Sequence, residues 1–230
     1  METRAVTEPP VALDDLVIRH TLSIDHQLAL RAALRRLTQE FSGVFADETV
    51  ERFLAGSYQQ YAARARFPNY VHLVAERYAR ARLTAFAIAE RHLDDGRPIL
   101  VFVCEGNDLL SPLARALTSR HAGEGALAWS AGIDPAVEFQ AGLETVLHEV
   151  GVPLTDDFPK PLAPEMLRAA TVVVTFGCAD KCPVYPGRQY IDAPAPTVAP
   201  GDLLELRHLR DQLDQMCGSL LGSLGVRTLP

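Results

Sequence analysis

Three cysteines in this sequence stand where thiol chemistry is plausible, and Cys104 is the first of them. It ends the apolar run of residues 99–103 and precedes a polar turn and a helix start at Ser111 and Pro112. A thiol in that position faces the amide-rich start of a helix, which favours thiolate and can hold an anion. Glu105 and Asp108 oppose this effect. A reactive or ligand thiol is therefore predicted at Cys104, the alternative being a small buried hydrophobic residue.

Cys178 and Cys182 lie four residues apart, directly before Pro183. On one helical turn or in a tight loop they could serve as resolving thiols or as ligands. Together with Cys104 they could form a three-thiolate site for a soft ion such as trivalent arsenic. No fourth ligand has the spacing of a zinc site, so neither a metal nor a cofactor is predicted. Cys217 is assigned to the core.

These cysteines are positioned by alternating strands and helices that begin at residue 97. A continuous apolar run such as residues 98–103 is typical of a strand buried on both faces. Ser111 is expected to cap the next helix, with Pro112 at its first position. The further strands are expected at 126–132, 171–176 and 189–191, and the further helices at 138–150, 164–170 and 202–224.

This alternation predicts an α/β fold with a small four-stranded parallel sheet and helices on both of its faces. Open sheets of this kind bind ligands at the carboxyl ends of their strands. The site is therefore expected where the first and third strands end, at Cys104 and at residues 177–183. Two stretches more than seventy residues apart in the sequence are predicted to meet there.

The chain before this α/β segment has helical periodicity only. Leu30, Leu34, Leu37 and Phe41 share one helical face, and two more amphipathic segments begin near Asp47 and after the break at residues 68–69. We predict an N-terminal three-helix bundle over residues 1–96, with a short disordered arm at residues 1–15. The α/β domain is predicted over residues 97–230.

Composition restricts the class of function. The formal net charge of −7 argues against a nucleic-acid partner, because such partners are held mainly by phosphate contacts. No leader peptide and no apolar run of roughly 20 residues is present, so a cytoplasmic protein without a membrane partner is predicted. In that compartment the cysteines are expected to be reduced thiols.

Four stretches of residues 97–198 resemble the arsenate reductases built on the low-molecular-weight tyrosine phosphatase fold. The helical segment before them is similar to the bundle that precedes the reductase domain in some bacterial members. The matching stretches are Ser130-Ala-Gly132, Phe158-Pro-Lys-Pro-Leu162, Val173-Val-Thr-Phe-Gly-Cys178 and Cys182-Pro-Val-Tyr-Pro-Gly187.

In that family a nucleophilic cysteine opens a loop of pattern Cys-x5-Arg-Ser, whose amides and arginine enclose arsenate or phosphate. An aspartate on a later loop protonates the leaving oxygen. The resemblance implies that Cys104 is the nucleophile, that Asn107 and Ser111 belong to the anion loop, and that Cys178 and Cys182 resolve the thiol–arsenic adduct. It also implies a small thiol such as mycothiol, or a thioredoxin-type protein, as the reductant.

Two positions depart from the family pattern. Leu110 stands at the position of the arginine, and an isobutyl group cannot neutralise an oxyanion. Thr197 stands where the family has its acid, and a threonine hydroxyl is a poor proton donor near neutral pH. Asp202 could replace it only through a different loop path. Glu105 and Asp108 add negative charge to the same loop.

Three hypotheses follow, and the sequence leaves open whether the protein is an enzyme. It is a non-catalytic binding or regulatory module, a thiol protein of altered chemistry acting through Cys104, or a working arsenate reductase or phosphatase whose loop is rearranged. The ligand is expected to be a small molecule or a soft ion. The helical domain is a candidate surface for homodimerisation.

Overall fold

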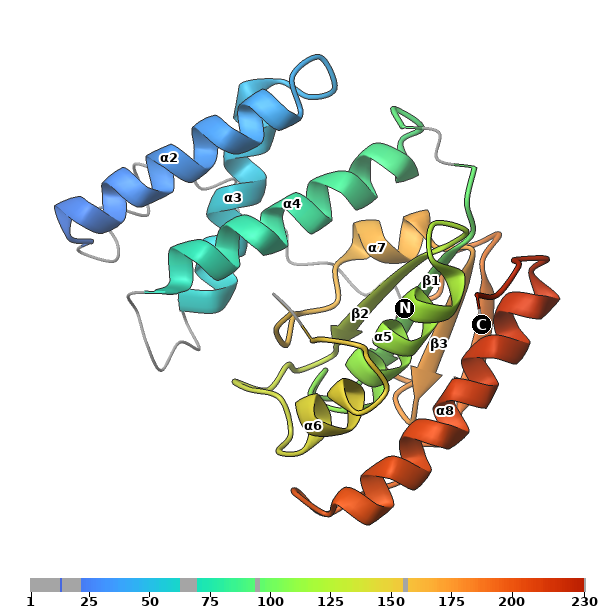
Figure 1. Cartoon of the computed structure of the whole chain (residues 1–230). Helices are drawn as coiled ribbons and strands as arrows, with labels where there is room; N and C mark the ends of the chain where they lie inside the picture. The colour runs from blue at the N-terminus through green and yellow to red at the C-terminus, as the bar shows by residue number, and fades with distance from the viewer. Residues whose placement is uncertain (1–12, 14–21, 63–69, 94–95, 155–156, 230) are drawn as a thin grey trace. The chain divides into compact units, whose positions relative to one another are not determined.

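The apolar run that ends in Cys104 forms the central strand of a parallel sheet. In this computed structural model, β1 (Ile99–Cys104) pairs with β2 (Leu127–Gly132) on one side and with β3 (Val172–Phe176) on the other, and β4 (Gln189–Ala193) pairs with β3 (Figure 1). All three pairings are parallel. Every residue of β1 is buried, as expected for a strand covered on both faces. The predicted four-stranded α/β fold is confirmed.

The structure describes residues 13, 22–62, 70–93, 96–154 and 157–229. These residues divide into two units, of which the first ends at Ala87 and the second begins at Ile88. The boundary between residues 96 and 97 stays a prediction. The predicted arm, except for residue 13, and the predicted break at residues 68–69 lie outside the described residues. No helix among the described residues has both the length and the apolar character needed to cross a membrane.

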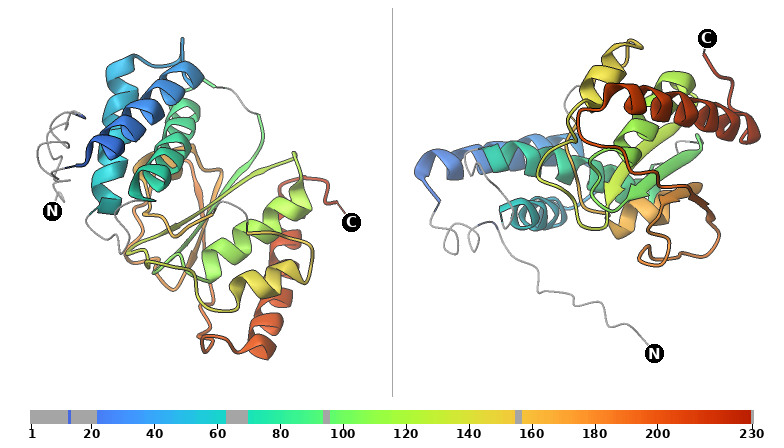
Figure 2. Two further views of the ribbon diagram at one scale, coloured as in Figure 1. Left: turned by 60° about the vertical axis from the view of Figure 1, so that its left-hand side comes forward. Right: turned by 90° about the horizontal axis from the view of Figure 1, so that it is seen from below.

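Helices cover both faces of the sheet, as predicted (Figures 1 and 2). Leu100 and Phe102 of β1 point into a core shared with α5 (Leu110–Ala122), α6 (Leu143–His148) and α8 (Leu203–Ser223). The alternate residues Val101 and Val103 point into a second core shared with Leu167 of α7 (Pro164–Ala169). This division follows from the two-residue period of a strand. Cys217 is fully buried in the first core, which confirms its assignment.

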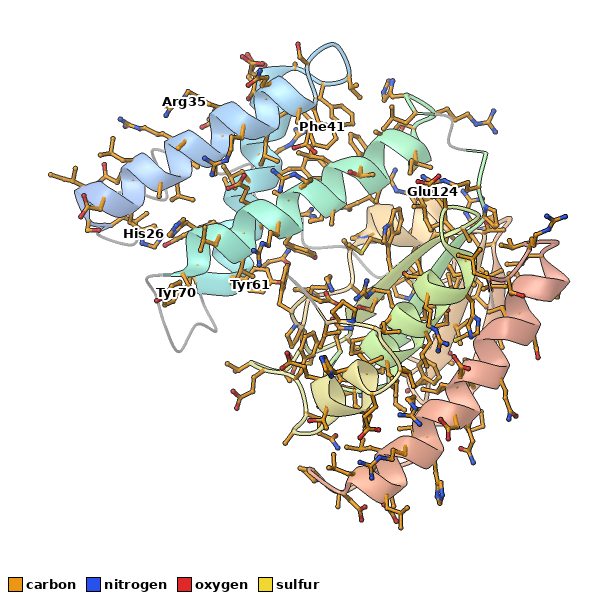
Figure 3. The ribbon with its side chains drawn as sticks, in the orientation of Figure 1. His26, Arg35, Phe41, Tyr61, Tyr70 and Glu124 are labelled. Atoms are coloured by element: carbon orange, nitrogen blue, oxygen red, sulfur yellow. The ribbon has the colours of Figure 1, made fainter. Side chains whose placement is uncertain are left out.

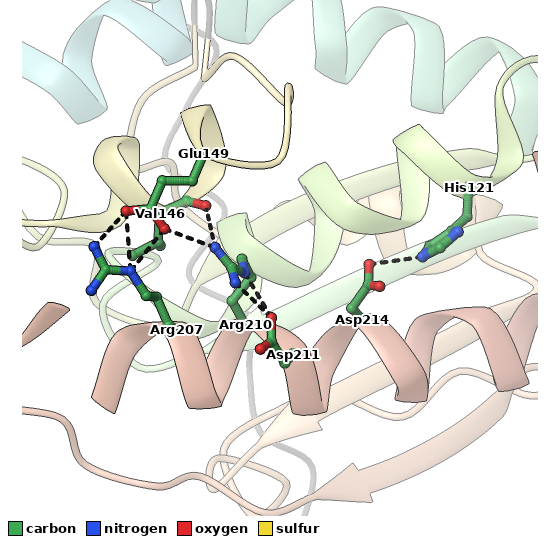
Figure 4. A network of polar contacts seen from close by, with 7 residues as sticks. All are labelled: His121, Val146, Glu149, Arg207, Arg210, Asp211 and Asp214. Carbon is green, nitrogen blue, oxygen red and sulfur yellow. Dashed lines mark hydrogen bonds and ion pairs between the residues drawn. The ribbon is translucent and has the colours of Figure 1, made fainter. Parts of the chain in front are cut away.

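Ion pairs fix the position of α8 against α5 and α6 (Figure 4). Glu149 lies 2.6 Å from the Arg207 guanidinium and 3.0 Å from that of Arg210. Near the middle of α8, Asp214 Oδ1 lies 2.8 Å from His121 Nε2. Partly exposed pairs of this kind each contribute about 0–1 kcal/mol. They orient a helix whose stability comes mainly from its buried apolar stripe.

Two helix limits differ from the prediction. The helix α5 begins at Leu110, so Ser111 lies inside it and does not cap it. The expected helix at residues 138–150 is reduced to α6, because Gly142 adopts a left-handed backbone with φ of 96° and Gln140 bonds to other loops. The helix ends at His148, two residues before the predicted end at Val150, although Gly151 does have the left-handed φ of 73° expected of a glycine that follows a helix.

The described residues of the first unit form the helices α2 (Ile24–Glu40) and α3 (Asp47–Ala62) and most of α4 (Val71–Ala89). Leu30, Leu37 and Phe41 are buried on the inner face of α2, and Arg35 is exposed (Figure 3). The structure thus has helices at the three predicted places. Asp47 is the first residue of α3 and not the residue before it.

The burial of β1 gives a direct test of the fold. Leu100 is 0% exposed, and Leu204 on α8 is 64% exposed. Leu100→Ala is expected to lower the free energy of unfolding by about 2–5 kcal/mol, because it removes apolar contacts and leaves a cavity. The matched variant Leu204→Ala should change it by no more than about 0.5 kcal/mol. Urea denaturation followed by circular dichroism measures both, and equal losses would contradict the assignment of β1 to the core.

Candidate functional site

The carboxyl ends of β1 and β3 place two cysteine-bearing segments side by side. Cys104 is the last residue of β1, and Gly177 and Cys178 follow β3 directly. Because these strands are parallel neighbours, their ends meet at one edge of the sheet. The Cys178 sulfur lies 3.5 Å from the carbonyl oxygen of Val103, the residue before Cys104. The predicted meeting of the two stretches therefore occurs.

The loop that follows Cys104 is closed by backbone hydrogen bonds to residues 133–140. Four of its carbonyl oxygens accept from amides of that segment at 2.8–3.1 Å: Cys104 from Ile133, Glu105 from Asp134, Gly106 from Ala136, and Asp108 from Gln140. In a trans peptide the N–H points opposite to the C=O. The amides of residues 105, 106, 107 and 109 therefore turn toward the other side of the loop. The loop curves in this way although residue 108 is an aspartate and residues 109 and 110 are leucines.

Asn107 holds the loop in shape from within. Its backbone is left-handed, with φ of 48°, a conformation that asparagine tolerates better than most residues. Its Oδ1 accepts from the Lys160 amide at 2.8 Å, and its Nδ2 donates to Ser111 Oγ at 2.8 Å. The side chains of Asn107 and Ser111 are both fully buried. Asn107 therefore connects the loop to α5 and to the segment around Lys160.

Ser111 lies against the Cys104 sulfur. The two side-chain atoms are 3.0 Å apart, and Ser111 Oγ is also 3.3 Å from the Ala131 carbonyl oxygen. When the hydroxyl donates to Ala131, the neutral Cys104 thiol can donate to Ser111. If Cys104 ionises, the hydroxyl can rotate and donate to the thiolate. The residue that sequence analysis placed at a helix cap is instead a hydrogen-bond partner of the thiol.

Gly132 allows the loop to pack on the end of β2. A Cβ at this residue would lie 2.9 Å from the Asn107 amide nitrogen and 3.0 Å from the Glu105 carbonyl oxygen, closer than such contacts occur. Its own amide donates to the Lys160 carbonyl, and its carbonyl accepts from Leu162, both at 2.8 Å. The glycine of the Ser-Ala-Gly stretch is thus required by this close approach.

A pocket of about 290 Å³ opens beside Cys104. Among the described residues it is lined by no lysine, arginine or histidine, and its ionisable groups besides the thiol are Glu105 and Asp108. Leu110 forms part of its wall, and so does Thr197. The other lining residues are Gly106, Leu109, Gln140, Phe176, Gly177, Ala195, Pro196 and Val198. The lining therefore mixes apolar residues with two carboxylates and carries no positive side chain in the described part of the chain.

The aspartates near this pocket are engaged elsewhere. Asp202 caps α8, where its Oδ1 accepts from the amides of Leu204 and Glu205 at 3.2 and 3.1 Å. Asp192 accepts a 2.8 Å hydrogen bond from the Thr175 hydroxyl. Neither lines the pocket. In this structure Asp202 does not replace the family acid at residue 197.

Cys178 and Cys182 lie on one turn, in which the Cys182 amide donates to the Cys178 carbonyl at 3.1 Å. Both are buried, and burial raises the pKa of each to about 11. They pack in the core beneath the sheet and do not line the pocket. The four cysteines are free thiols. Among residues with a described position, no three His, Cys, Asp or Glu side chains are arranged to hold a metal ion, so a three-thiolate site is not preassembled.

An ion pair joins the two cysteine-bearing segments. Lys181 Nζ donates to both carboxylate oxygens of Glu105, at 3.0 and 2.9 Å, and both side chains are about half exposed. This contact partly offsets the negative charge of Glu105 at the pocket rim. Sequence analysis did not pair these residues, although each is adjacent to a cysteine of the site.

A buried ion cluster lies behind the loop, on the segment that contains Lys160. Asp157 is 2.5 Å from Lys160 Nζ and 3.0 Å from the Arg115 guanidinium. Burial acts to raise the pKa of Asp157, but the charges of Lys160 and Arg115 outweigh it and hold this pKa below its usual value. The sequence stretch around Lys160 was recognised, but its partner Arg115 on α5 was not, because only the tertiary fold brings the two together.

The chain matches a family model and is similar to known arsenate reductases in sequence and structure. The family model described as "Protein-tyrosine-phosphatase-like, N-terminal domain" matches residues 30–87. The structure is similar to that of a thioredoxin-dependent arsenate reductase from Corynebacterium glutamicum, with 33% identity and a TM-score of 0.79, covering 87% of this chain and 98% of that one. An arsenate reductase of Bacillus licheniformis is 29% identical over 89 residues, which span 38% of this chain and 63% of that protein.

The buried thiols generate a prediction about reactivity. Near pH 8, a thiol of pKa about 11 carries roughly 100-fold less thiolate than one at the ordinary value of 9.0. Iodoacetamide should therefore label Cys178 and Cys182 at least about 100-fold more slowly than a free thiol, with a rate that rises as pH approaches 11. Peptide mass spectrometry resolves each site. Labelling of either residue at the rate of a free thiol would show that it is not buried as described.

The ion cluster generates a prediction about stability. Asp157→Asn leaves two buried cations without their partner and should lower the free energy of unfolding by roughly 3–5 kcal/mol near neutral pH. Since the folded pKa is lowered, this stabilisation is present above the ordinary pKa of 3.8 and is lost as pH falls through the folded value.

The difference between wild type and Asp157→Asn should consequently shrink below about pH 4 in denaturation measured across pH. Asp211→Asn is the control, because the Asp211 side chain is 61% exposed and should contribute no more than about 1 kcal/mol. A difference that is independent of pH would exclude ionised Asp157 as the source of the stabilisation.

Proposed function

Because this chain belongs to the arsenate reductases built on the low-molecular-weight tyrosine phosphatase fold, we propose that it is a divergent member that has lost ordinary arsenate and phosphate chemistry and acts through the Cys104 thiol. The observation that carries this proposal is the lining of the pocket. Leu110 stands at the position of the family arginine, and none of the described lining residues is a cation that could replace it. A dianion entering the pocket would meet Glu105 and Asp108 without a guanidinium to neutralise it.

The loss extends to proton transfer. The residue at the acid position is Thr197, and a hydroxyl does not ionise in the range that general acid catalysis needs. Removing one preorganised charge donor commonly lowers the rate by about 10²–10³. Losing the arginine and the acid together affects both the binding of the oxyanion and the departure of the leaving oxygen.

What supports a retained thiol role is the intact surroundings of Cys104. Its sulfur borders the pocket, Ser111 is within hydrogen-bond distance, and Asn107 fixes the loop. We propose that Cys178 and Cys182, which lie on the segment after the neighbouring strand β3, support redox chemistry if they become accessible. The Corynebacterium relative is thioredoxin-dependent, so a thioredoxin-type protein or a small thiol is the reductant we propose. If the protein catalyses no reaction, we propose that it is a binding or regulatory module. The helical domain would then be the contact surface for a homodimer.

A second candidate function is arsenate reduction of the ordinary kind. The curvature of the loop supports it, because the amides of residues 105–107 and 109 turn away from residues 133–140 and amides can hold an oxyanion without side chains. Against it stand the two carboxylates of the same loop. The two candidates differ in whether attraction by the backbone amides of the loop exceeds repulsion by the Glu105 and Asp108 carboxylates.

Activity and ligand binding test the proposal. With a thioredoxin system as reductant, arsenate turnover should be at least about 100-fold below that of the Corynebacterium relative. Leu110→Arg restores the planar cation and should produce measurable tungstate or phosphate binding by calorimetry, where the wild type shows none. Leu204→Arg places the same charge on an exposed helix residue and should produce no binding. Wild-type turnover comparable to that of the Corynebacterium relative, and lost in Cys104→Ser, would overturn the proposal in favour of ordinary arsenate reduction.

A further inference from the structure

A second pocket, of about 300 Å³, lies between α5 and residues 151–153, and we call it the arginine pocket. The side chains of Arg115 and Arg120 line it together with Ser119, and none of its described lining residues is an aspartate or a glutamate. The pocket beside Cys104 has the opposite character, with two carboxylates and no cation in its described lining. Of these two pockets, the arginine pocket is therefore the one that offers positive charge to a ligand.

Arg115 belongs to a cluster with an excess of positive charge. Asp157 is 2.5 Å from Lys160 Nζ and 3.0 Å from the Arg115 guanidinium, so two cations share one carboxylate. The Lys160 side chain is 11% exposed, whereas that of Arg115 is 23% exposed and lines the arginine pocket. Arg115 Nε has no hydrogen-bond partner among the described residues, so part of the donor capacity of this group is unused. The excess charge can therefore be reached from the pocket through Arg115.

Arg120 supplies the second cation of the pocket. It is exposed and lies in the last turn of α5. It follows Arg115 by five residues, which corresponds to a rise of ~7.5 Å along the helix axis and a rotation of roughly 140° around it. The two arginines thus start from well-separated points and line the same pocket. This arrangement suits two anionic groups joined by a spacer better than the single centre of a phosphate ion.

Carboxylates match these two cations in shape as well as in charge. A guanidinium group donates two parallel hydrogen bonds to the two oxygens of one carboxylate. Pro153 is exposed and adds an apolar surface to the lining. We infer that the arginine pocket binds a small dicarboxylate, with one carboxylate on Arg115, the other on Arg120 and the carbon chain against Pro153. This inference does not depend on the proposed function, because none of these residues lines the pocket beside Cys104.

Isothermal titration calorimetry of the full chain at low ionic strength tests this inference. The probe is succinate, and butyrate is its control, because it has a chain of the same length with one carboxylate instead of two. Succinate should bind at least about tenfold more tightly than butyrate, since only succinate makes charged hydrogen bonds to both arginines. Added salt should weaken the binding of succinate, because it screens exposed charges. Inorganic phosphate should bind more weakly than succinate, and equal affinity would show that the pocket responds to charge alone and overturn the inference.

Three variants locate the binding. Arg120→Gln changes an exposed residue and should reduce the affinity for succinate to about that for butyrate, while the affinity for butyrate stays nearly unchanged. Arg115→Lys keeps a cation beside Asp157 but removes the planar group, and should also weaken succinate binding. Arg35→Gln removes the same charge from the exposed face of α2 and should have no effect (Figure 3).

Three results would overturn the inference. The first is the absence of succinate binding at millimolar concentrations, and the second is equal affinity for succinate and butyrate. The third is an equal loss of succinate affinity in Arg35→Gln and Arg120→Gln, which would assign the binding to the overall charge of the protein.

Discussion

The hydrogen bonds of Asn107 are the interaction on which the site depends. One buried amide side chain fixes the Cys104 loop to the Lys160 backbone and to Ser111, and Ser111 in turn contacts the sulfur. Removing such a side chain leaves buried donors and acceptors unsatisfied, which costs about 1–3 kcal/mol each. The left-handed backbone at this residue is maintained by the same bonds. Contacts inside the protein thus hold the shape of the loop.

Shape and charge are therefore separate properties of this loop. The backbone follows from Asn107, from the close approach of Gly132, and from the carbonyl bonds to residues 133–140. None of these involves the side chain of residue 110. A leucine can replace an arginine there without changing the curvature, because Leu110 packs at the edge of the core beside α5. An oxyanion fold can in this way persist after the charge that defines oxyanion chemistry is gone.

Local sequence signals predicted the parts of the structure that local interactions determine. The apolar run before Cys104 predicted β1, and the alternation after it predicted a parallel sheet that brings the cysteine segments together. Two predicted helix limits were wrong, the cap at Ser111 and the helix over residues 138–150. At Ser111 and at Gln140, side-chain hydrogen bonds to other parts of the site outweigh the local preference. The burial of Cys178 and Cys182 and the pairing of Asp157 with Arg115 depend on packing between distant elements, which no local pattern contains.

Lys160 takes part in two interactions that are usually separate. Its backbone amide bonds to Asn107, and its ammonium is paired with Asp157 in a buried cluster. A continuous path of contacts consequently runs from Asp157 through Lys160, Asn107 and Ser111 to the Cys104 sulfur. The carboxylate of Asp157 does not line the pocket, yet it neutralises the residue whose backbone holds Asn107. The integrity of the cysteine loop therefore depends on a segment that lies outside the pocket.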